Sequence, residues 1–498
     1  MRDHKPTVID QFNGLWRRGD FDSTPPDHFS ECNNIQYIQG GFKTRDGIDT
    51  YLAYPTVLRM YTFNQESGQS LLILDDAGNI YDSGSTTPLT PILTIAGMTD
   101  FGFTPFAGRA YISPCDGVTG LENEFVYVYE GDGTVARKAG GVSPVDIDGL
   151  LAAANSATVG NVEPGIHIYA VVYETESGFL TNMGPDTLPV LTTPGGFSVD
   201  LSNIPVSTDP SVTTVHLLST KGINPLIYSG DPRSYEFFFI PGGDVPNGTL
   251  TKTVSYFDAD LLDSADDLED LFEEIPAGVG LGVYHNRLLV YTTFNDISLV
   301  YVSNVGEPEA INQIDGLLIF PLDGEPITNA QEFRDVLYVF KQKRTNAWSD
   351  NGDSPSSWPL TILDQGIGCS LHGLSTVLDS GGVNVDFLIT SDYAGIYLFN
   401  GTFVKPELSW KIKDLWLALD RDKFNYIRAI NDTVKQILYF LLPDFRILMG
   451  DYSNGLEPKP IRWATWTFDV QATDLALVET NTLVIGVLGL IEVEDVSI

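Results

Sequence analysis

Positively charged side chains are scarce in this sequence. Its 498 residues contain 28 Lys and Arg against 66 Asp and Glu, which gives a formal net charge of -38 at pH 7. A protein that grips nucleic acid needs Lys and Arg on the gripping face, because its affinity comes largely from neutralising phosphates and releasing counterions. The charge balance therefore argues against ordinary DNA binding. It suits a surface that nucleic acid slides past, and equally an acidity that only maintains solubility.

Cysteine is also rare. The sequence has 3 cysteines, Cys32, Cys115 and Cys369, far apart and without C-x-x-C spacing. This pattern indicates neither a disulfide framework nor a zinc site. The opening residues MRDHKPTVID lack the apolar stretch of a signal peptide, and no run approaches the roughly 20 apolar residues that span a bilayer. We expect a soluble protein that folds in a reducing cytoplasm and has no membrane partner.

Helical periodicity is nearly absent, whereas short apolar or β-branched runs bounded by Gly, Asp, Asn and Pro are frequent. This pattern predicts strands joined by tight turns. The clearest runs are Ser70–Ile73, Phe125–Tyr129, Leu288–Tyr291, Val336–Phe340, Phe387–Thr390 and Leu438–Leu442.

The strand-and-turn pattern recurs with similar short amino-acid sequences. Gly-Asn-Ile-Tyr closes one strand at Gly78–Tyr81, and Gly-Ile-Tyr at Gly395–Tyr397 leads to an Asn400-Gly401 hairpin turn. Approximate repetition of a small sheet is typical of a β-propeller, whose blades bury their faces against one another. A propeller also explains the chain length, because it grows by adding blades. The alternative is that an all-β chain repeats turns and strands by chance.

The middle of the chain departs from this pattern. Gly165–Gly178 alternates strictly, and three runs of similar length follow at Phe197–Leu201, Val212–Leu218 and Glu236–Ile240. Evenly spaced strands over about 100 residues predict an inserted immunoglobulin- or fibronectin-like β-sandwich. The Ala-, Ser- and Asn-rich stretch Leu150–Gly160 is interpreted as a linker.

The predicted organisation is therefore an all-β protein, a β-propeller interrupted by a β-sandwich. Its segments are an N-terminal arm with the first propeller strands at 1–55, the first part of the propeller at 56–149, the sandwich at 160–257, an acidic helical linker at 258–277 and the second part of the propeller at 278–498.

The acidic linker contains the run DADLLDSADDLEDLFEE. Its apolar residues fall near helical spacing, which favours a short amphipathic helix packed on the propeller; these residues are Leu261, Leu268, Leu271, Phe272 and Ile275. A metal site is the alternative, but the run lacks the glycine and the ligand spacing of a calcium loop.

Catalytic motifs are missing. The 6 histidines are scattered, and the sequence has no H-E-x-x-H, G-x-S-x-G or Walker glycine loop. We therefore predict no enzyme activity and no catalytic, cofactor-binding or metal-binding residues, although residues distant in sequence can still form an active site.

A glycosidase would need two carboxylates beside aromatic side chains in a cleft. Trp348 and Trp358 lie near Asp350, Asp353 and Asp364 in the sequence, which makes this the first place to look. The preferred interpretation is that these residues line a loop or an interface between subunits.

Near the N-terminus, apolar and aromatic residues precede two cations in an otherwise anionic chain. Trp and Arg are favoured at protein interfaces, so this arm is a candidate docking segment for a neighbouring subunit. The alternative is that the arm completes the chain's own propeller. The candidate residues are Phe12, Leu15, Trp16, Arg17 and Arg18.

The same arm carries the most specific family signal. Phe12-Asn13-Gly14-Leu15-Trp16 leads to Cys32-Asn33-Asn34-Ile35 and then to Gly40-Gly41-Phe42-Lys43-Thr44-Arg45-Asp46-Gly47. This resembles an N-terminal pattern of bacteriophage virion proteins, F-x-G-G-L, N-x-x and G-G-hydrophobic-x-x-R-x-G. Asn13 stands where that pattern has a second glycine. Later segments also resemble tail nozzle or tail hub proteins of short-tailed phages, namely His285–Leu288, Ser303–Glu309, Leu337–Lys341, Gly366–Ser370, Gly395–Gly401, Asp451–Tyr452 and Trp463–Trp466.

The resemblance covers most of the chain outside the insert. It implies a propeller subunit of the head-to-tail connection, commonly in a six-fold ring below the portal and adaptor, through which the genome leaves. Its partners would be copies of itself, the adaptor or portal and other tail proteins, with double-stranded DNA passing but not specifically bound. Such a protein is made in the bacterial host cytoplasm and resides in the virion tail, without a cofactor. Alternatives are a tail protein that binds host-surface glycans and, less favoured, a tail enzyme that cleaves them.

Overall fold

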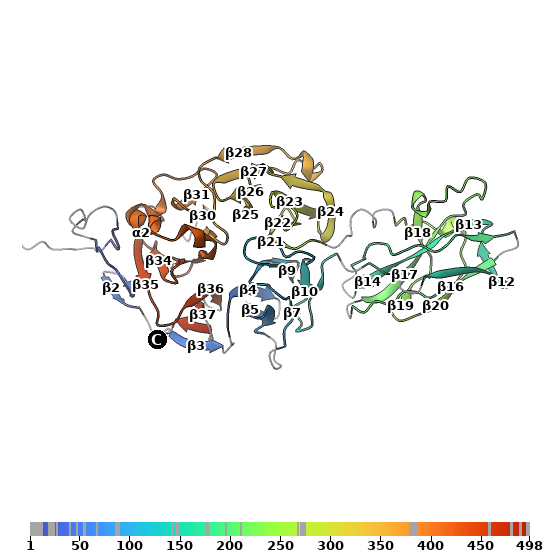
Figure 1. Ribbon diagram of the computed structural model, residues 1–498, viewed down its shortest axis with the longest axis horizontal. Coiled ribbons are helices and arrows are strands. Elements are labelled where there is room, and N and C mark those ends of the chain that lie inside the picture. Colours follow the sequence, from blue (N-terminus) through green and yellow to red (C-terminus); the bar gives the residue numbers. More distant parts are fainter. Residues whose placement is uncertain are drawn as a thin grey trace, which may run out of the picture.

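A computed structural model describes the chain outside twenty short segments. These are residues 1–12, 18–24, 26–27, 39–40, 46–47, 53–55, 66–67, 85–89, 141–142, 146–148, 176–178, 195–196, 210–211, 266–267, 269–274, 378–386, 457–459, 479–481, 488–490 and 495–498. Figure 1 shows a ring of small sheets with a separate β unit projecting from one side. The ring is a β-propeller, as the sequence predicted.

In the described residues, seven antiparallel sheets form the blades of the propeller. Blade 1 consists of β4 (Arg59–Gln65), β5 (Gly68–Leu74), β6 (Asn79–Asp82) and β7 (Leu93–Thr94). Blade 2 consists of β8 (Asp100–Phe106), β9 (Arg109–Cys115), β10 (Tyr127–Tyr129) and β11 (Arg137–Lys138). Blade 3 consists of β21 (Gly278–Tyr284), β22 (Arg287–Thr293), β23 (Leu299–Asn304) and β24 (Glu307–Leu318). Blade 4 consists of β25 (Ile327–Phe333), β26 (Val336–Lys341), β27 (Arg344–Trp348) and β28 (Leu360–Asp364).

The remaining three blades come from the C-terminal part. Blade 5 consists of β29 (Leu374–Val377), β30 (Phe387–Asp392) and β31 (Gly395–Phe399). Blade 6 consists of β32 (Arg428–Asp432), β33 (Ile437–Leu441), β34 (Ile447–Asp451) and β35 (Arg462–Trp466). Blade 7 consists of β36 (Ala472–Val478), β37 (Thr482–Val487) and β38 (Ile491–Glu494), and its outermost strand is β3 (Ile48–Leu52). One strand from the N-terminal part of the chain and three from its C-terminal part therefore close the ring in a single sheet.

Hydrophobic clusters between successive blades hold the ring together. Phe63 of blade 1 packs with Phe101 of blade 2, and Leu289 of blade 3 packs with Val339 of blade 4. Val484 of blade 7 lies in one cluster with blade 1, so the ring is also closed by packing. Each blade buries both faces against its neighbours, which explains why the central strands are almost entirely buried and mostly apolar.

The insert contains two sheets on a shared core. One sheet has the order β12 (Leu151–Val162), β16 (Phe197–Ser202), β20 (Thr251–Val254). In the other, β17 (Val212–Thr220) pairs with β14 (Tyr169–Thr175), β18 (Phe237–Phe239) and β19 (Val245–Pro246). Val171 and Leu217 of the second sheet are buried in one cluster with Val199 and Leu201 of the first. A two-stranded ribbon, β13 (Gly165–His167) and β15 (Val190–Thr192), completes the unit. The immunoglobulin- or fibronectin-like assignment stays a prediction.

Two details of the predicted insert need correction. The stretch Leu150–Gly160 is not a linker, because 151–162 form the edge strand β12, whose small polar side chains face solvent on most positions. An edge strand with one exposed face tolerates such residues, and this hid it in the sequence. The run Gly165–Gly178 contains two strands, β13 and β14, rather than one.

Eight of the 20 residues of the predicted acidic helical linker, 266–267 and 269–274, lie outside the described residues. The described part contains a short 3-10 turn, η3 (Asp258–Asp260), and a helical residue at Leu268. Leu261 and Leu268 are buried in clusters of the insert, not on the propeller as expected, whereas Ile275 packs between blades 2 and 3. The segment therefore packs first on the insert and then returns to the propeller.

The remaining elements are short. A hairpin of β1 (Ile35–Ile38) and β2 (Gly41–Thr44) lies beside blade 6. The helical segments are η2 (Pro232–Ser234), η4 (Pro355–Ser357), η5 (Leu408–Ile412), α2 (Lys413–Leu417) and η6 (Arg421–Tyr426). Among the helices of the described residues, none has the length and apolar character needed to cross a membrane.

Candidate functional site at the propeller axis

The first strand of each blade lies nearest the propeller axis, and several of these strands carry charged side chains. Arg59 begins β4, Asp100 begins β8 and Arg428 begins β32. Asp474 lies in β36, and His372 comes just before β29. Because successive first strands contact one another around the ring, these five side chains from distant parts of the sequence meet at its centre.

The charged groups form one buried network. The Arg59 Nε donates to Asp100 Oδ1 at 2.9 Å, and His372 Nε2 lies 2.7 Å from Asp100 Oδ2. Asp474 Oδ1 lies 3.4 Å from Arg428 Nε and 3.9 Å from an Arg59 Nη atom. Since two guanidinium groups face two carboxylates, the network is balanced in charge, as buried ionic groups must be.

The hydrogen-bond partners also fix where the protons lie. Arg428 donates to the Tyr61 hydroxyl at 3.0 Å, so the hydroxyl hydrogen of Tyr61 is free to point at His372 Nδ1, 3.4 Å away. The hydrogen of the neutral imidazole is then on Nε2 and is donated to Asp100. The result is a chain of hydrogen bonds from Arg428 through Tyr61 and His372 to Asp100. The two groups at its ends, Arg428 and Asp100, are charged.

Burial and charge set the protonation states of the groups in this chain of hydrogen bonds. Burial alone would raise the pKa of Asp100, but Arg59 and His372 together hold it below its usual value. Burial lowers the pKa of His372, and the nearby Asp100 offsets this only in part. Burial raises the pKa of Tyr61 to about 12 against the opposing influence of Arg428. At neutral pH the network therefore contains an ionised Asp100, a neutral His372 and a protonated Tyr61, each engaged with a partner.

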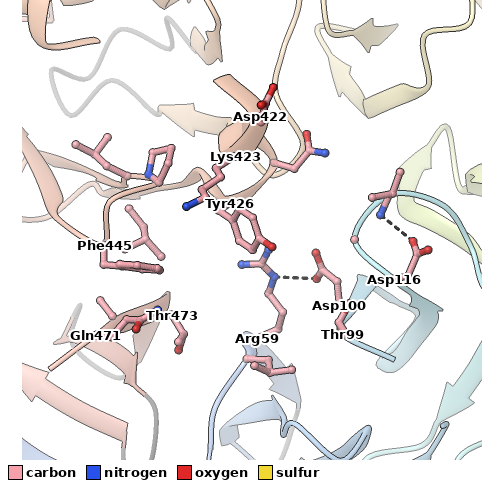
Figure 2. Close-up of a pocket in the computed structure, with 18 residues that line it drawn as sticks. Arg59, Thr99, Asp100, Asp116, Asp422, Lys423, Tyr426, Phe445, Gln471 and Thr473 are labelled. Carbon is pink, nitrogen blue, oxygen red and sulfur yellow. Dashed lines mark hydrogen bonds and ion pairs between the residues drawn. The ribbon is translucent and has the colours of Figure 1, made fainter. Parts of the chain in front are cut away.

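Two cavities border the network. The larger, of about 590 Å³, is lined at its base by Arg59 and Asp100 and at its sides by Tyr426, Phe445 and Gln471. Figure 2 shows Tyr426 and Lys423 above the Arg59–Asp100 pair, with Phe445, Gln471 and Thr473 to one side.

The second cavity, of about 290 Å³, is lined by Tyr61, His372 and Arg428. Because residues of one network line both cavities, the network divides the axial space. The larger cavity is of the size that small-molecule sites usually have, and about half of its lining residues are polar or charged.

The described part of the N-terminal arm packs on its own chain. Leu15 is only 2% exposed and lies in the core around blade 6, with its backbone N–H donating to the Trp463 carbonyl. The half-buried Trp16 meets the ring of Trp410 edge-on, and the Arg17 backbone N–H donates to the Lys411 carbonyl. Phe12 and Arg18 lie outside the described residues. A contact of this arm with a neighbouring subunit stays a prediction.

The tryptophans considered for a sugar cleft do not line one. Trp348 and Trp358 are 3% and 4% exposed and belong to the core between blades 3 and 4. The Trp358 indole N–H donates to the Asp353 carbonyl, and the Asp364 carboxylate accepts N–H bonds from its own turn. These aromatic rings stabilise the blades and offer no stacking surface to a ligand.

Sequence reasoning missed the axial residues. The only available signal was positional, because Arg59, Asp100 and Arg428 each stand directly before or at the start of an inner strand. A charged residue repeated at that point of several blades predicts a polar axis, once the blades are correctly aligned.

No protein-family model and no curated protein sequence matches this chain. Solved structures with a similar arrangement include BBS1N in complex with ARL6DN, soaked with lead, at 9% identity and a TM-score of 0.30, covering 91% of this chain and 98% of that chain. Streptogramin B lyase matches at 6% identity and a TM-score of 0.30, covering 90% of this chain and 97% of that chain. Likenesses this remote carry no argument about function.

Proposed function

We propose that this protein is a structural subunit of a bacteriophage tail, without enzyme activity. Identical copies, six by analogy with tail nozzle proteins, would form a ring that lines the DNA exit channel. The ring would join the adaptor or portal and other tail proteins, and would help to retain and release the genome. The sequence resemblance suggests this family, and the distribution of charged side chains supports the proposed function.

The observation that carries the proposal is where the few cations lie. In several buried pairs a cation is matched by a carboxylate, so both charges are removed from the surface together. The pairs are Arg59 with Asp100, Arg137 with Glu309, Lys341 with Asp323 and Arg462 with Asp451. The net charge of -38 is therefore carried by a surface with still fewer cations than the composition suggests. Such a surface repels the phosphates of passing DNA and offers little to hold them.

The closed axis adds a geometric constraint. Side chains of Arg59, Tyr61 and Arg428 occupy the centre of the propeller, so nothing as wide as duplex DNA passes through it. A channel for DNA would have to lie between copies of the chain. In a closed cyclic ring every copy presents the same face to that channel, which multiplies the effect of its carboxylates.

The proposal is tested with the purified full-length protein. We expect light scattering after gel filtration to give a multiple of the 54.6 kDa chain. Negative-stain images should show closed rings, and gel-shift assays at low salt should show no retention of double-stranded DNA. A protein that stays monomeric at high concentration, or that binds DNA with a steep salt dependence, contradicts the proposal.

A second candidate is a tail protein that recognises host-surface glycans. The observation in its favour is the larger axial cavity, where the exposed rings of Tyr426 and Phe445 lie near the amides of Asn425 and Gln471. Aromatic faces with a few polar groups are a common way to bind a ligand. This candidate expects the protein to adsorb to host cells and Tyr426→Ala to abolish adsorption. Release of reducing ends from host polysaccharide would instead indicate a glycan-cleaving enzyme.

A further inference from the structure

Two neighbouring blades bring metal-ligating side chains together away from the larger axial cavity. His285 lies in the turn between β21 and β22 of blade 3. Glu332 lies near the end of β25, and Asp335 lies in the turn between β25 and β26 of blade 4. One ligand atom from each of the three residues lies within 4.8 Å of the others. Arg59 and Asp100 are the first residues of inner strands β4 and β8, and both line the larger cavity. The turns that contain His285 and Asp335 follow the last residues of inner strands, so they lie at the opposite end of the propeller.

The surroundings orient the three side chains. The Tyr284 ring stacks on the His285 imidazole, with centroids 4.1 Å apart and planes 18° apart. Glu332 accepts the backbone N–H of His285 at 3.0 Å, and the Tyr284 hydroxyl donates to the Asp335 carbonyl at 3.2 Å. The imidazole and both turns are therefore held in place by contacts that leave carboxylate oxygens available. Outer contacts of this kind orient ligands in known metal sites.

A third carboxylate lies beside the same imidazole. Asp350 Oδ2 is 3.7 Å from His285 Nδ1, and the Asp350 backbone N–H donates to the Tyr284 hydroxyl at 2.9 Å. This carboxylate adds negative charge beside the imidazole, whereas the three ligand atoms that lie within 4.8 Å of one another come from His285, Glu332 and Asp335. The nearest cation on the other side of Asp350 is Arg287, whose Nε is also 3.7 Å from Oδ2.

We propose that His285, Glu332 and Asp335, with Asp350 beside the imidazole, form a binding site for one divalent transition-metal ion such as Zn²⁺. The imidazole distinguishes this site from a simple cluster of acidic residues and favours a transition metal. Mg²⁺ and Ca²⁺ prefer all-oxygen ligands, whereas Zn²⁺ accepts nitrogen and carboxylate oxygen together. His285 is 36% exposed, so an ion from solvent can reach it.

Such an ion would join the turns of two blades. His285 belongs to blade 3, whereas Glu332 and Asp335 belong to blade 4, so the metal bonds would cross a blade boundary at one end of the propeller. Binding that occurs only in the folded ring raises the free energy of unfolding in proportion to the logarithm of the metal concentration. The inference does not depend on the proposed tail function, and either can fail without the other.

The test is calorimetric titration of Zn²⁺ into the full-length protein after treatment with a chelator, with thermal unfolding measured with and without the ion. We expect one ion per chain and a higher unfolding temperature when it is bound. His285→Ala and Glu332→Gln should each weaken binding by at least about tenfold and abolish the thermal shift. Glu332→Gln keeps an oxygen that can accept the His285 N–H, so this variant should remain folded.

Two matched variants serve as controls. His216 is bonded to Glu174 and Asp244 at its two ring nitrogens, in the insert, so His216→Ala tests whether any histidine between carboxylates suffices. Asp353→Asn removes an exposed acidic group from the loop that contains Asp350. Both controls should bind Zn²⁺ as the parent protein does. Absence of binding, or equal binding by the parent and both His285→Ala and Glu332→Gln, overturns the proposal.

Discussion

Arg137 and Glu309 form a bidentate ion pair across the boundary between blades 2 and 3, with Nη–carboxylate distances of 2.6 and 2.7 Å. Both side chains are almost fully buried, and Glu309 also accepts the backbone N–H of Gly140. Arg137 lies in the last strand before the insert, and the Phe179 ring of the insert lies 5.4 Å from its guanidinium. The pair therefore fixes the point at which the chain leaves the propeller.

Glu309→Gln should strongly destabilise the protein, because it leaves the buried charge of Arg137 without its partner. Breaking one side of a buried ion pair costs about 3–5 kcal/mol. The free energy of unfolding in urea measures this loss. Glu130→Gln is the control, since that carboxylate is 26% exposed and 3.6 Å from Arg137, and partly exposed pairs contribute at most about 1 kcal/mol. Equal losses in the two variants would contradict this account of the junction.

The axial network predicts a pH dependence that His372 controls. Burial lowers the pKa of His372 in the folded protein, so just below a pH of about 6.5 the unfolded chain binds more protons than the folded one. The free energy of unfolding then falls as pH decreases, by at most about 1.4 kcal/mol per pH unit. Urea unfolding between about pH 7.5 and pH 5 should show the advantage of the parent protein over His372→Gln shrinking as pH falls. Parallel curves for the two proteins would show that His372 is not the group responsible.

Local patterns predicted most of the propeller strands, because a strand and its turn are neighbours in sequence. The runs Leu288–Tyr291 and Val336–Phe340 lie inside β22 and β26. The closure of the ring was not predictable in this way, since β3 and β38 come from opposite ends of the chain. The axial site could not be predicted for the same reason, because Arg59 of blade 1 and Asp474 of blade 7 are far apart in sequence and meet only in the closed ring.

Asp392 should show the opposite pH dependence from His372. Burial raises the pKa of Asp392 to about 6, although N–H groups of Ala394 and Gly395 bond to its carboxylate. Between the ordinary value near 3.8 and about 6 the folded protein binds more protons, so this contribution to stability is lost as pH rises through about 6. Relative to the parent protein, Asp392→Asn should therefore become more stable as pH increases from 4 to 7, by up to about 1.4 kcal/mol per pH unit within that window. A pH-independent difference in urea unfolding would contradict the assignment.

Leu15 separates the two interpretations of the N-terminal arm. Its side chain is 2% exposed and lies in the core that includes Tyr37 and Trp463, so Leu15→Ala should leave a cavity in the subunit itself. Substitutions of this kind cost about 2–5 kcal/mol. We expect a lower unfolding temperature for Leu15→Ala with an unchanged oligomeric state at low temperature, measured by light scattering. Trp16→Ala is the comparison, because the half-buried Trp16 ring contacts Trp410 and His28 but retains exposed surface. A Leu15→Ala protein that keeps its unfolding temperature but loses its assembly would show instead that the arm docks on a neighbouring copy.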